Sequence, residues 1–364
     1  MSKAAELAAL IGSGQAQGNK NLIINGAMQV AQRGTSETGV NSTQYANGPD
    51  RWKVAINHGT FTISQSTTAP AGFATSYKFD CTTADTSLAA DAQINLQQSI
   101  EGLNVQSIKK GTSDAKPVTV SFHVRSNKTG TYICSLFDED NIRRVAKTYT
   151  IDSANTWERK TITFPADTTG ALNNDTGIGL YVQWYIAAGS NYTSGTLATT
   201  WESQTVANIC PGLTVNMADS TDNEWYITGV QLEIGEQATP FEHRSFGDEL
   251  ARCQRYYYFH GQGTGSNSGD IGIGSYYDSV SLDVVVQFPV TMRATPTVDA
   301  TSGTDYYVSF RNSGADRFNS FILNKGSPSA VAIGNSSEAS GTGGQATLIR
   351  YENASARVAF DSEL

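Results

Sequence analysis

The chain has 364 residues, of which 39% are hydrophobic and only 16% are charged. A chain of this length predicts about two domains, and the low charge together with 34 glycines favours short strands joined by many turns. The net charge of -9 argues against nucleic acid or an anionic membrane surface as a principal partner, because binding to phosphate groups needs clustered Lys and Arg side chains.

Residues 1–19 are predicted to form a short helical arm followed by a flexible linker. Apolar residues from Ala4 to Ile11 recur on one helical face, and a Gly-rich run ends at Gly18. A helix this short is marginal in water, so two interpretations stay open: an arm that docks on a partner or on copies of itself, and a frayed tail. The segment is a poor signal peptide, and no stretch of the sequence is long and apolar enough to span a bilayer, so we expect no membrane insertion.

Residues 20–244 are predicted to form an antiparallel β domain. The segment 21–34 (NLIINGAMQVAQRG) indicates a strand, a tight Asn25-Gly26 turn and a return to the core. No convincing helix interrupts residues 21–234, which favours antiparallel sheets packed face to face. Strand patterns occur at 60–64, 76–79, 92–100, 118–124, 132–137, 147–151, 161–164 and 178–186.

The stretch 224–258 ends this domain and begins the next. Residues 225–234 alternate with the period of two that is typical of a strand with one buried face. Ser245, followed by Asp248, predicts the start of a helix. The apolar face of this helix is expected to carry Phe246, Leu250, Cys253 and Tyr257.

Residues 245–364 are therefore predicted to be an interdomain helix plus a C-terminal β domain. The longest clean strand pattern of the whole sequence lies at 280–288. Further short strands are predicted at 306–310, 318–323, 346–351 and 357–360.

Spacing patterns give little support for catalysis. The 4 cysteines and 4 histidines show no CxxC, HExxH or HxH spacing, and no serine lies in a GxSxG turn. We therefore expect free thiols and no enzyme activity, although the two acids of a glycosidase can lie far apart in a sequence. The basic pairs Lys109-Lys110 and Arg143-Arg144 are interpreted as solvated turn or edge residues.

Several segments resemble those of structural proteins that tailed bacteriophages and prophages encode, of the tail-fibre type. They are NLIINGAMQVAQRG with the triplet DRW, LQQSIEGL before VTVSFHVRS, TWERKTITF, and the run from WYITGVQLEIG to CQRYYY. The first domain is also similar to the jelly-roll carbohydrate-binding modules of glycoside hydrolases, which start at an Asn-Gly corner and end in an aromatic-rich strand.

The resemblance implies an all-β architecture: a jelly-roll β-sandwich followed by a second β-sandwich-like domain, with a short N-terminal helix and one interdomain helix. It also implies a non-enzymatic virion protein, assembled in the host cytoplasm as a homotrimer. Its arm would bind other phage tail or virion proteins, and its sandwich would attach the particle to a bacterial surface polysaccharide. Two alternatives stay open, a head or tail decoration protein without glycan binding and a polysaccharide depolymerase.

The resemblance does not carry a metal site to this chain. Modules of this kind often hold calcium beside the first Asn-Gly corner, through an acidic residue just after it. Ala27, Met28 and Gln29 occupy that place here. No calcium ligand, other metal site or cofactor is therefore predicted.

Strand alternation predicts one polar and aromatic face on the first domain. If the apolar residues of 92–100, 118–124 and 178–186 point into the core, their neighbours point the opposite way. Amides, a guanidinium and tyrosine rings suit a glycan, whose hydroxyls need directional partners and whose C–H faces stack on rings. The predicted glycan-binding residues are Asn95, Gln97, His123, Arg125, Tyr181, Gln183 and Tyr185, with Trp157 and Trp201 near strand ends as further candidates.

This polar and aromatic face has a second interpretation, in which it is simply solvated or covers a subunit interface. The other three tryptophans, Trp52, Trp184 and Trp225, are assigned to the core.

Overall fold

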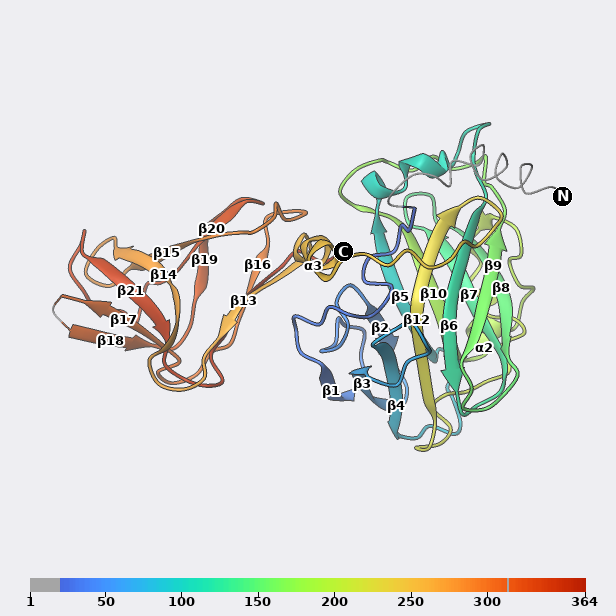
Figure 1. The fold of residues 1–364 in the computed structure, drawn as a ribbon, viewed down its shortest axis with the longest axis horizontal. Helices are drawn as coiled ribbons and strands as arrows, with labels where there is room; N and C mark the ends of the chain where they lie inside the picture. Colours follow the sequence, from blue (N-terminus) through green and yellow to red (C-terminus); the bar gives the residue numbers. More distant parts are fainter. Residues whose placement is uncertain (1–19, 313) are drawn as a thin grey trace. The chain divides into compact units, whose positions relative to one another are not determined.

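The computed structural model describes residues 20–312 and 314–364, which form two compact, all-β units (Figure 1). The first unit runs to Glu249 and includes Leu364, and the second comprises Leu250–Glu363. The division falls inside helix α3 (Phe246–Gln254). The predicted arm at residues 1–19 lies outside the described residues.

The first unit is a jelly-roll β-sandwich of two six-stranded antiparallel sheets (Figure 1). The β12 sheet contains β1 (Ser36–Val40), β3 (Thr60–Ser66), β4 (Ser76–Thr83), β12 (Glu224–Ile234), β6 (Val118–Ser126) and β9 (Glu158–Phe164), in that spatial order. The β10 sheet contains β11 (Glu202–Ser203), β8 (Arg143–Ile151), β7 (Gly130–Asp138), β10 (Ile178–Ala188), β5 (Gln93–Glu101) and β2 (Lys53–Ile56). The chain changes sheet between β4 and β5, between β5 and β6 and again between β6 and β7, as a jelly roll requires.

Large aromatic side chains from both sheets fill the core of the sandwich. The ring of Trp184 on β10 lies 5.6 Å from that of Phe122 on β6 and 5.7 Å from that of Trp52. The ring of Trp225 on β12 lies 5.8 Å from that of Phe79. The assignment of all three tryptophans to the core is confirmed, since none is more than 1% exposed.

The N-terminal corner of the sandwich is fixed by Asn25, whose φ is +57°. Its side-chain oxygen accepts a hydrogen bond from the amide of Val30 (3.0 Å), and its carbonyl accepts one from the amide of Met28 (3.0 Å). The predicted turn at Asn25-Gly26 is thereby confirmed. Gly26 is needed there because a Cβ atom would overlap the carbonyl oxygen of Val230 on β12.

Strand β12 is buried on both faces, not on one as its alternation predicts. Its outer face is covered by two segments of the same unit. Thr228 donates a hydrogen bond to the carbonyl of Thr75 (2.8 Å), and Gln231 accepts one from the amide of Glu242 (2.8 Å). The polar residues of β12 therefore hold covering loops and do not face water.

Short helices interrupt the strands of the first unit, contrary to expectation. They are η1 (Gly102–Asn104), η2 (Gln106–Ile108), α2 (Ser190–Thr193) and η3 (Val206–Asn208). The last two belong to an insertion between β10 and β12. Ile209 and Cys210 of this insertion pack against Tyr185, Ile133 and Ala146 on the outer side of the β10 sheet.

Helix α3 begins where the sequence predicts. The hydroxyl oxygen of Ser245 accepts a hydrogen bond from the amide of Asp248 (3.2 Å) and caps the first turn. The predicted apolar face is only partly correct, because Phe246 is 56% exposed and Tyr257 lies in a strand that follows the helix. Within the helix, Cys253 is fully buried and Leu250 is partly buried.

The second unit is β-sandwich-like, with one core between two antiparallel sheets. The smaller sheet contains β13 (Tyr257–Gln262), β22 (Arg357–Asp361) and β16 (Thr297–Ala300). The larger sheet contains β18 (Gly314–Phe318), β17 (Tyr307–Arg311), β21 (Ala346–Tyr351), β14 (Ser268–Tyr276), β15 (Leu282–Gln287), β20 (Ala330–Asn335) and β19 (Ile322–Gly326). Val358 and Phe360 of the smaller sheet share the core with Val284 and Ile349 of the larger one.

Two strands predicted for this unit are shorter or broken. The pattern at 280–288 gives β15, which starts only at Leu282. Val280 lies in a turn instead, because the carboxylate of Asp278 accepts hydrogen bonds from the amides of Val280 (2.8 Å) and Ser281 (2.7 Å). The pattern at 318–323 is split between the end of β18 and the start of β19.

Candidate functional site

The residues predicted to form one glycan-binding face lie on two different sheets. Gln97 of β5 pairs across the strands with Gln183 of β10, and Asn95 pairs with Tyr185, so these four and Tyr181 share the outer face of the β10 sheet. His123 and Arg125 lie on β6 and therefore belong to the β12 sheet. The two sheets share a core, so their outer faces point away from each other. The prediction of a single face is therefore wrong.

Arg125, Trp157 and His123 lie on the outer face of the β12 sheet. The Arg125 guanidinium lies 4.9 Å from the centre of the Tyr226 ring, and the Trp157 ring lies 6.2 Å from the same ring. The ring of His123 lies 5.3 Å from that of Phe73. Burial, and next the positive charge of Arg159, lower the pKa of His123, which therefore favours its neutral form.

Trp201 has a structural role. Its indole nitrogen donates a hydrogen bond to the carbonyl of Pro165 (2.9 Å). Its ring lies 4.9 Å from the ammonium nitrogen of Lys110, a cation–π contact inside the unit. The ring is thus engaged by groups of the chain itself.

A hollow of about 390 Å³ opens on the outer face of the β10 sheet. Strands β5, β7, β8 and β10 form its floor, and the insertion that contains η3 forms one side. The residues that line this β10 hollow are Gln93, Gln97, Phe137, Glu139, Arg144, Tyr181, Gln183, Tyr185, Tyr192, Gln204, Val206 and Ile209.

Strand register brings the polar residues of the β10 hollow together. Gln183 is opposite Gln97 on one side and Ser135 on the other. The Gln183 amide nitrogen donates to Gln97 Oε1 (2.8 Å), and its oxygen accepts from Arg144 Nη1 (2.6 Å). Gln183 is thus held in one orientation by its neighbours, which makes the floor of the hollow rigid and polar.

Two aromatic rings stand beside this polar floor. Phe137 and Tyr181 are cross-strand partners, and their rings stack with centres 5.9 Å apart and planes 27° apart. Both side chains are partly exposed. Partly exposed aromatic rings next to fixed amides are a combination that suits sugar rings.

Two of the predicted residues are buried beneath the insertion. Tyr185 borders the hollow but is only 1% exposed, and Asn95 is fully buried. Burial raises the pKa of Tyr185 to about 12, although Arg144 opposes this shift. Tyr185 therefore stays a neutral phenol and supports Gln183, to which its hydroxyl donates a hydrogen bond (3.2 Å).

The sequence interpretation missed Phe137 and Arg144. Phe137 follows Leu136, and Arg144 precedes Val145; both apolar neighbours belong to the core. The alternation argument that placed Gln183 would have placed these two on the outer face as well. Arg143-Arg144 was interpreted as a solvated pair, and this is corrected by the 4% exposure of Arg144.

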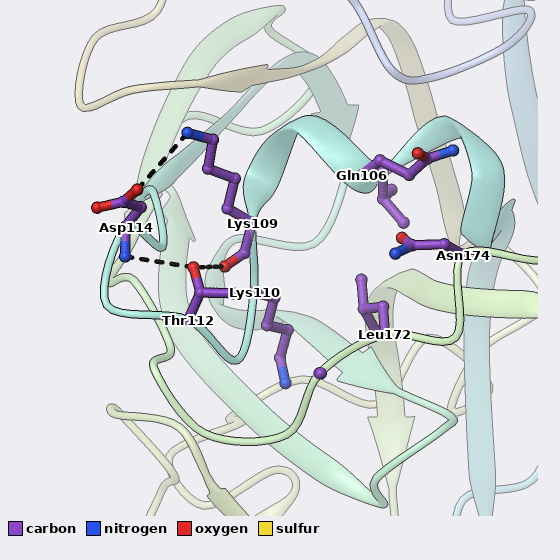
Figure 2. Close-up of a pocket in the computed structure, with 9 residues that line it drawn as sticks. Gln106, Lys109, Lys110, Thr112, Asp114, Leu172 and Asn174 are labelled. Atoms are coloured by element: carbon purple, nitrogen blue, oxygen red, sulfur yellow. Dashed lines mark hydrogen bonds and ion pairs between the residues drawn. The ribbon is translucent and has the colours of Figure 1, made fainter.

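A second hollow, of about 380 Å³, lies beside η2 (Figure 2). Its rim includes Lys109 and Asp114, whose charged atoms are 3.8 Å apart, and Thr112, which donates to the Lys109 carbonyl (2.7 Å). Figure 2 shows the Lys110 side chain turned away from this rim. None of the residues that line the hollow is aromatic, so it lacks a stacking surface for a sugar.

The described part of the chain shows no residues arranged as a metal site and no membrane-spanning helix. No cluster of three or more His, Cys, Asp or Glu side chains in residues 20–312 and 314–364 is arranged to hold a metal ion. Cys81, Cys134, Cys210 and Cys253 are buried free thiols, as predicted. In the same residues, no helix combines the length and the apolar character needed to cross a membrane.

The solved structures to which this chain is similar include several distant likenesses. No family model matches the sequence, and no curated protein matches it. A bacteriophage CBA120 tailspike protein 4 domain is 12% identical with a TM-score of 0.29, over 59% of this chain and 21% of its own. A putative sugar-binding protein from Bacteroides thetaiotaomicron is 13% identical with a TM-score of 0.34, over 59% of this chain and 99% of its own.

A family 11 carbohydrate-binding module from Clostridium thermocellum, in complex with a mixed-linked tetrasaccharide, is 10% identical with a TM-score of 0.27. The match covers 58% of this chain and 99% of the module. Likenesses at this level carry no ligand or activity over to this chain.

Proposed function

We propose that the β10 hollow binds a bacterial surface glycan and that the chain is the adhesin of a bacteriophage tail fibre. The observation that supports glycan binding is the stacked pair Phe137–Tyr181 beside the fixed amides of Gln97 and Gln183. Sugar C–H faces stack on aromatic rings, and sugar hydroxyl groups form hydrogen bonds with amides. The β10 hollow offers both kinds of contact.

The phage role in this proposal is supported by the sequence segments 21–34 and 225–258, which resemble those of tail-fibre proteins. On this view the chain is a homotrimeric virion protein assembled in the host cytoplasm, and residues 1–19 attach it to other tail or virion proteins. It binds and does not cleave the polysaccharide. Hydrolysis of a glycoside needs two carboxyl groups, and Glu139 is the only carboxylate among the residues that line the hollow.

Tyr181→Ala is expected to weaken binding to the polysaccharide that an array of bacterial glycans identifies. Loss of one stacked ring should cost about 0.5–1.5 kcal/mol, or roughly a two- to tenfold rise in Kd. Isothermal titration calorimetry with the purified full chain measures this change.

Trp157→Ala is the matched control, because it removes a partly exposed ring from the outer face of the β12 sheet. Its affinity should equal that of the unchanged protein. If the protein binds no polysaccharide on the array, the proposed function is wrong. A loss confined to the Trp157 variant would show that the glycan binds to the other sheet.

A further inference from the structure

Arg144 is a buried cation without an anionic partner. Its Nη1 donates to Gln183 Oε1 (2.6 Å) and to Ser135 Oγ (2.7 Å), and its Nε donates to Gln204 Oε1 (2.8 Å). All of these partners are neutral. Among residues 20–312 and 314–364, no carboxylate lies within ion-pair distance of its guanidinium.

Arg143 and Arg244, two other largely buried cations of the first unit, are paired with acids. Arg143, the preceding residue, contacts both carboxylate oxygens of Asp167, at 2.8 and 3.1 Å. Arg244 lies 3.4 Å from a carboxylate oxygen of Glu249. A buried charge that lacks a counter-charge is unfavourable, so the environment of Arg144 favours an anion that the chain does not supply.

One nitrogen of the Arg144 guanidinium, Nη2, is available to a ligand. Nη2 donates no hydrogen bond within the described chain. This nitrogen is not fully buried, so a ligand can reach it. The Phe137 ring lies 4.8 Å from the guanidinium carbon. Arg144, Phe137 and Tyr181 are neighbours across adjacent strands, so a sugar that lies against the Phe137–Tyr181 pair would have the guanidinium of Arg144 beside it.

We propose that the glycan bound in the β10 hollow is acidic, and that the carboxylate of one sugar accepts a hydrogen bond from Arg144 Nη2. This inference rests on the proposed function, because it specifies the ligand of the same hollow. Charge-assisted hydrogen bonds from arginine to carboxylate are about twice as strong as neutral ones. Glu139 is exposed at the rim of the hollow and repels the same anion.

The test compares acidic polysaccharides with their own carboxyl-reduced forms, so that only the charge differs. Polygalacturonate, alginate and hyaluronate, each native and reduced, are titrated into the full chain. We expect at least one native polymer to bind about tenfold more tightly than its reduced form. This difference should shrink as salt is added, because salt screens the attraction.

Two variants locate the effect. Arg144→Gln should abolish the preference for the acidic polymer, whereas Glu139→Gln should strengthen binding of the acidic polymer and leave the reduced one unchanged. Should Arg144→Gln fail to fold, an unchanged affinity of Glu139→Gln for the acidic polymer would by itself overturn the inference.

The outcomes separate the inference from the proposed function. Equal affinity for native and reduced polymers, or capture of neutral glycans only, would overturn the acidic ligand and leave glycan binding intact. Absence of binding to any polysaccharide, acidic or neutral, would overturn both.

Discussion

The ammonium group of Lys110 is enclosed by oxygen atoms inside the first unit. It donates to Asp138, to Asp167 (3.0 Å) and to the carbonyl of Gly170 (2.9 Å). Burial raises the pKa of Asp167, but hydrogen bonds from Arg143 and Lys110 outweigh burial and hold that pKa below its ordinary 3.8. Asp167 is therefore charged at neutral pH and depends on its two cations.

Lys110→Met is expected to destabilise the first unit by about 3–5 kcal/mol at neutral pH, because it leaves two buried carboxylates short of a counter-charge. Denaturant unfolding followed by tryptophan fluorescence measures this loss, since all 5 tryptophans belong to the first unit. A carboxylate whose pKa is lowered by folding stabilises above its ordinary pKa, and this contribution disappears as the pH falls through the folded value. The difference between variant and unchanged protein should therefore shrink below about pH 4.

Lys109→Met is the control for this change. The Lys109 side chain is 53% exposed and lies 3.8 Å from Asp114, and exposed pairs of this kind contribute about 0–1 kcal/mol. Equal losses in the two variants would contradict the enclosed role of Lys110.

The same two basic pairs show what sequence reasoning at the residue scale misses. Solvation was expected for Lys109-Lys110 and Arg143-Arg144, yet of these four only Lys109 is exposed. Lys110 is bound to Asp138, which lies 28 residues further along the chain. Distant pairing of this kind is set by the tertiary fold and leaves no local pattern, so the burial of Lys110 could not be predicted from its sequence neighbours.

At the scale of the element, α3 is a short helix with a defined start. Its N-cap is Ser245, and a Cβ atom at Gly247 would have no heavy atom within 4 Å. The first amides of a helix have no partner within it. A proline at position 247 therefore has room for its Cβ atom and removes no helical hydrogen bond, whereas a proline at position 251 removes an interior bond.

Ala251→Pro is accordingly expected to cost about 3 kcal/mol or more, and Gly247→Pro clearly less. Hydrogen exchange of the α3 amides, read together with thermal unfolding of the full chain, measures both effects. Similar protection and similar Tm in the two variants would contradict the helix boundaries.

The positions of many strands and the jelly-roll architecture were predicted correctly, while the sheet to which each strand belongs was not. The patterns at 60–64, 118–124 and 178–186 lie within β3, β6 and β10, because period-two alternation is a local property. Which sheet each strand joins depends on the order of sheet crossings, and so His123 was placed with Gln183 although they lie on opposite faces. The four-residue helix α2 was missed because a segment so short has no helical period.

At the scale of the whole molecule, the tail-fibre proposal and the decoration alternative differ in where the chain lies in the particle. An adhesin must meet the cell surface before the rest of the phage. Gold-labelled antibodies against the purified chain should therefore mark the distal end of the tail in electron micrographs of particles that contain it. Labelling of the capsid would support head decoration and contradict the adhesin.

The position of β12 has a consequence for how the first unit is made. This strand pairs with β4 on one side and β6 on the other, yet it is the last strand of its sandwich in the chain. More than a hundred residues separate the end of β6 from the end of β12. At a synthesis rate of about 5–20 residues per second, the apolar face of β6 stays uncovered for roughly 5–20 s before the strand between it and β4 is made, and that of β4 for longer. The sandwich therefore closes late, and until then a nascent chain leaving the ribosome exposes the surfaces that chaperones bind.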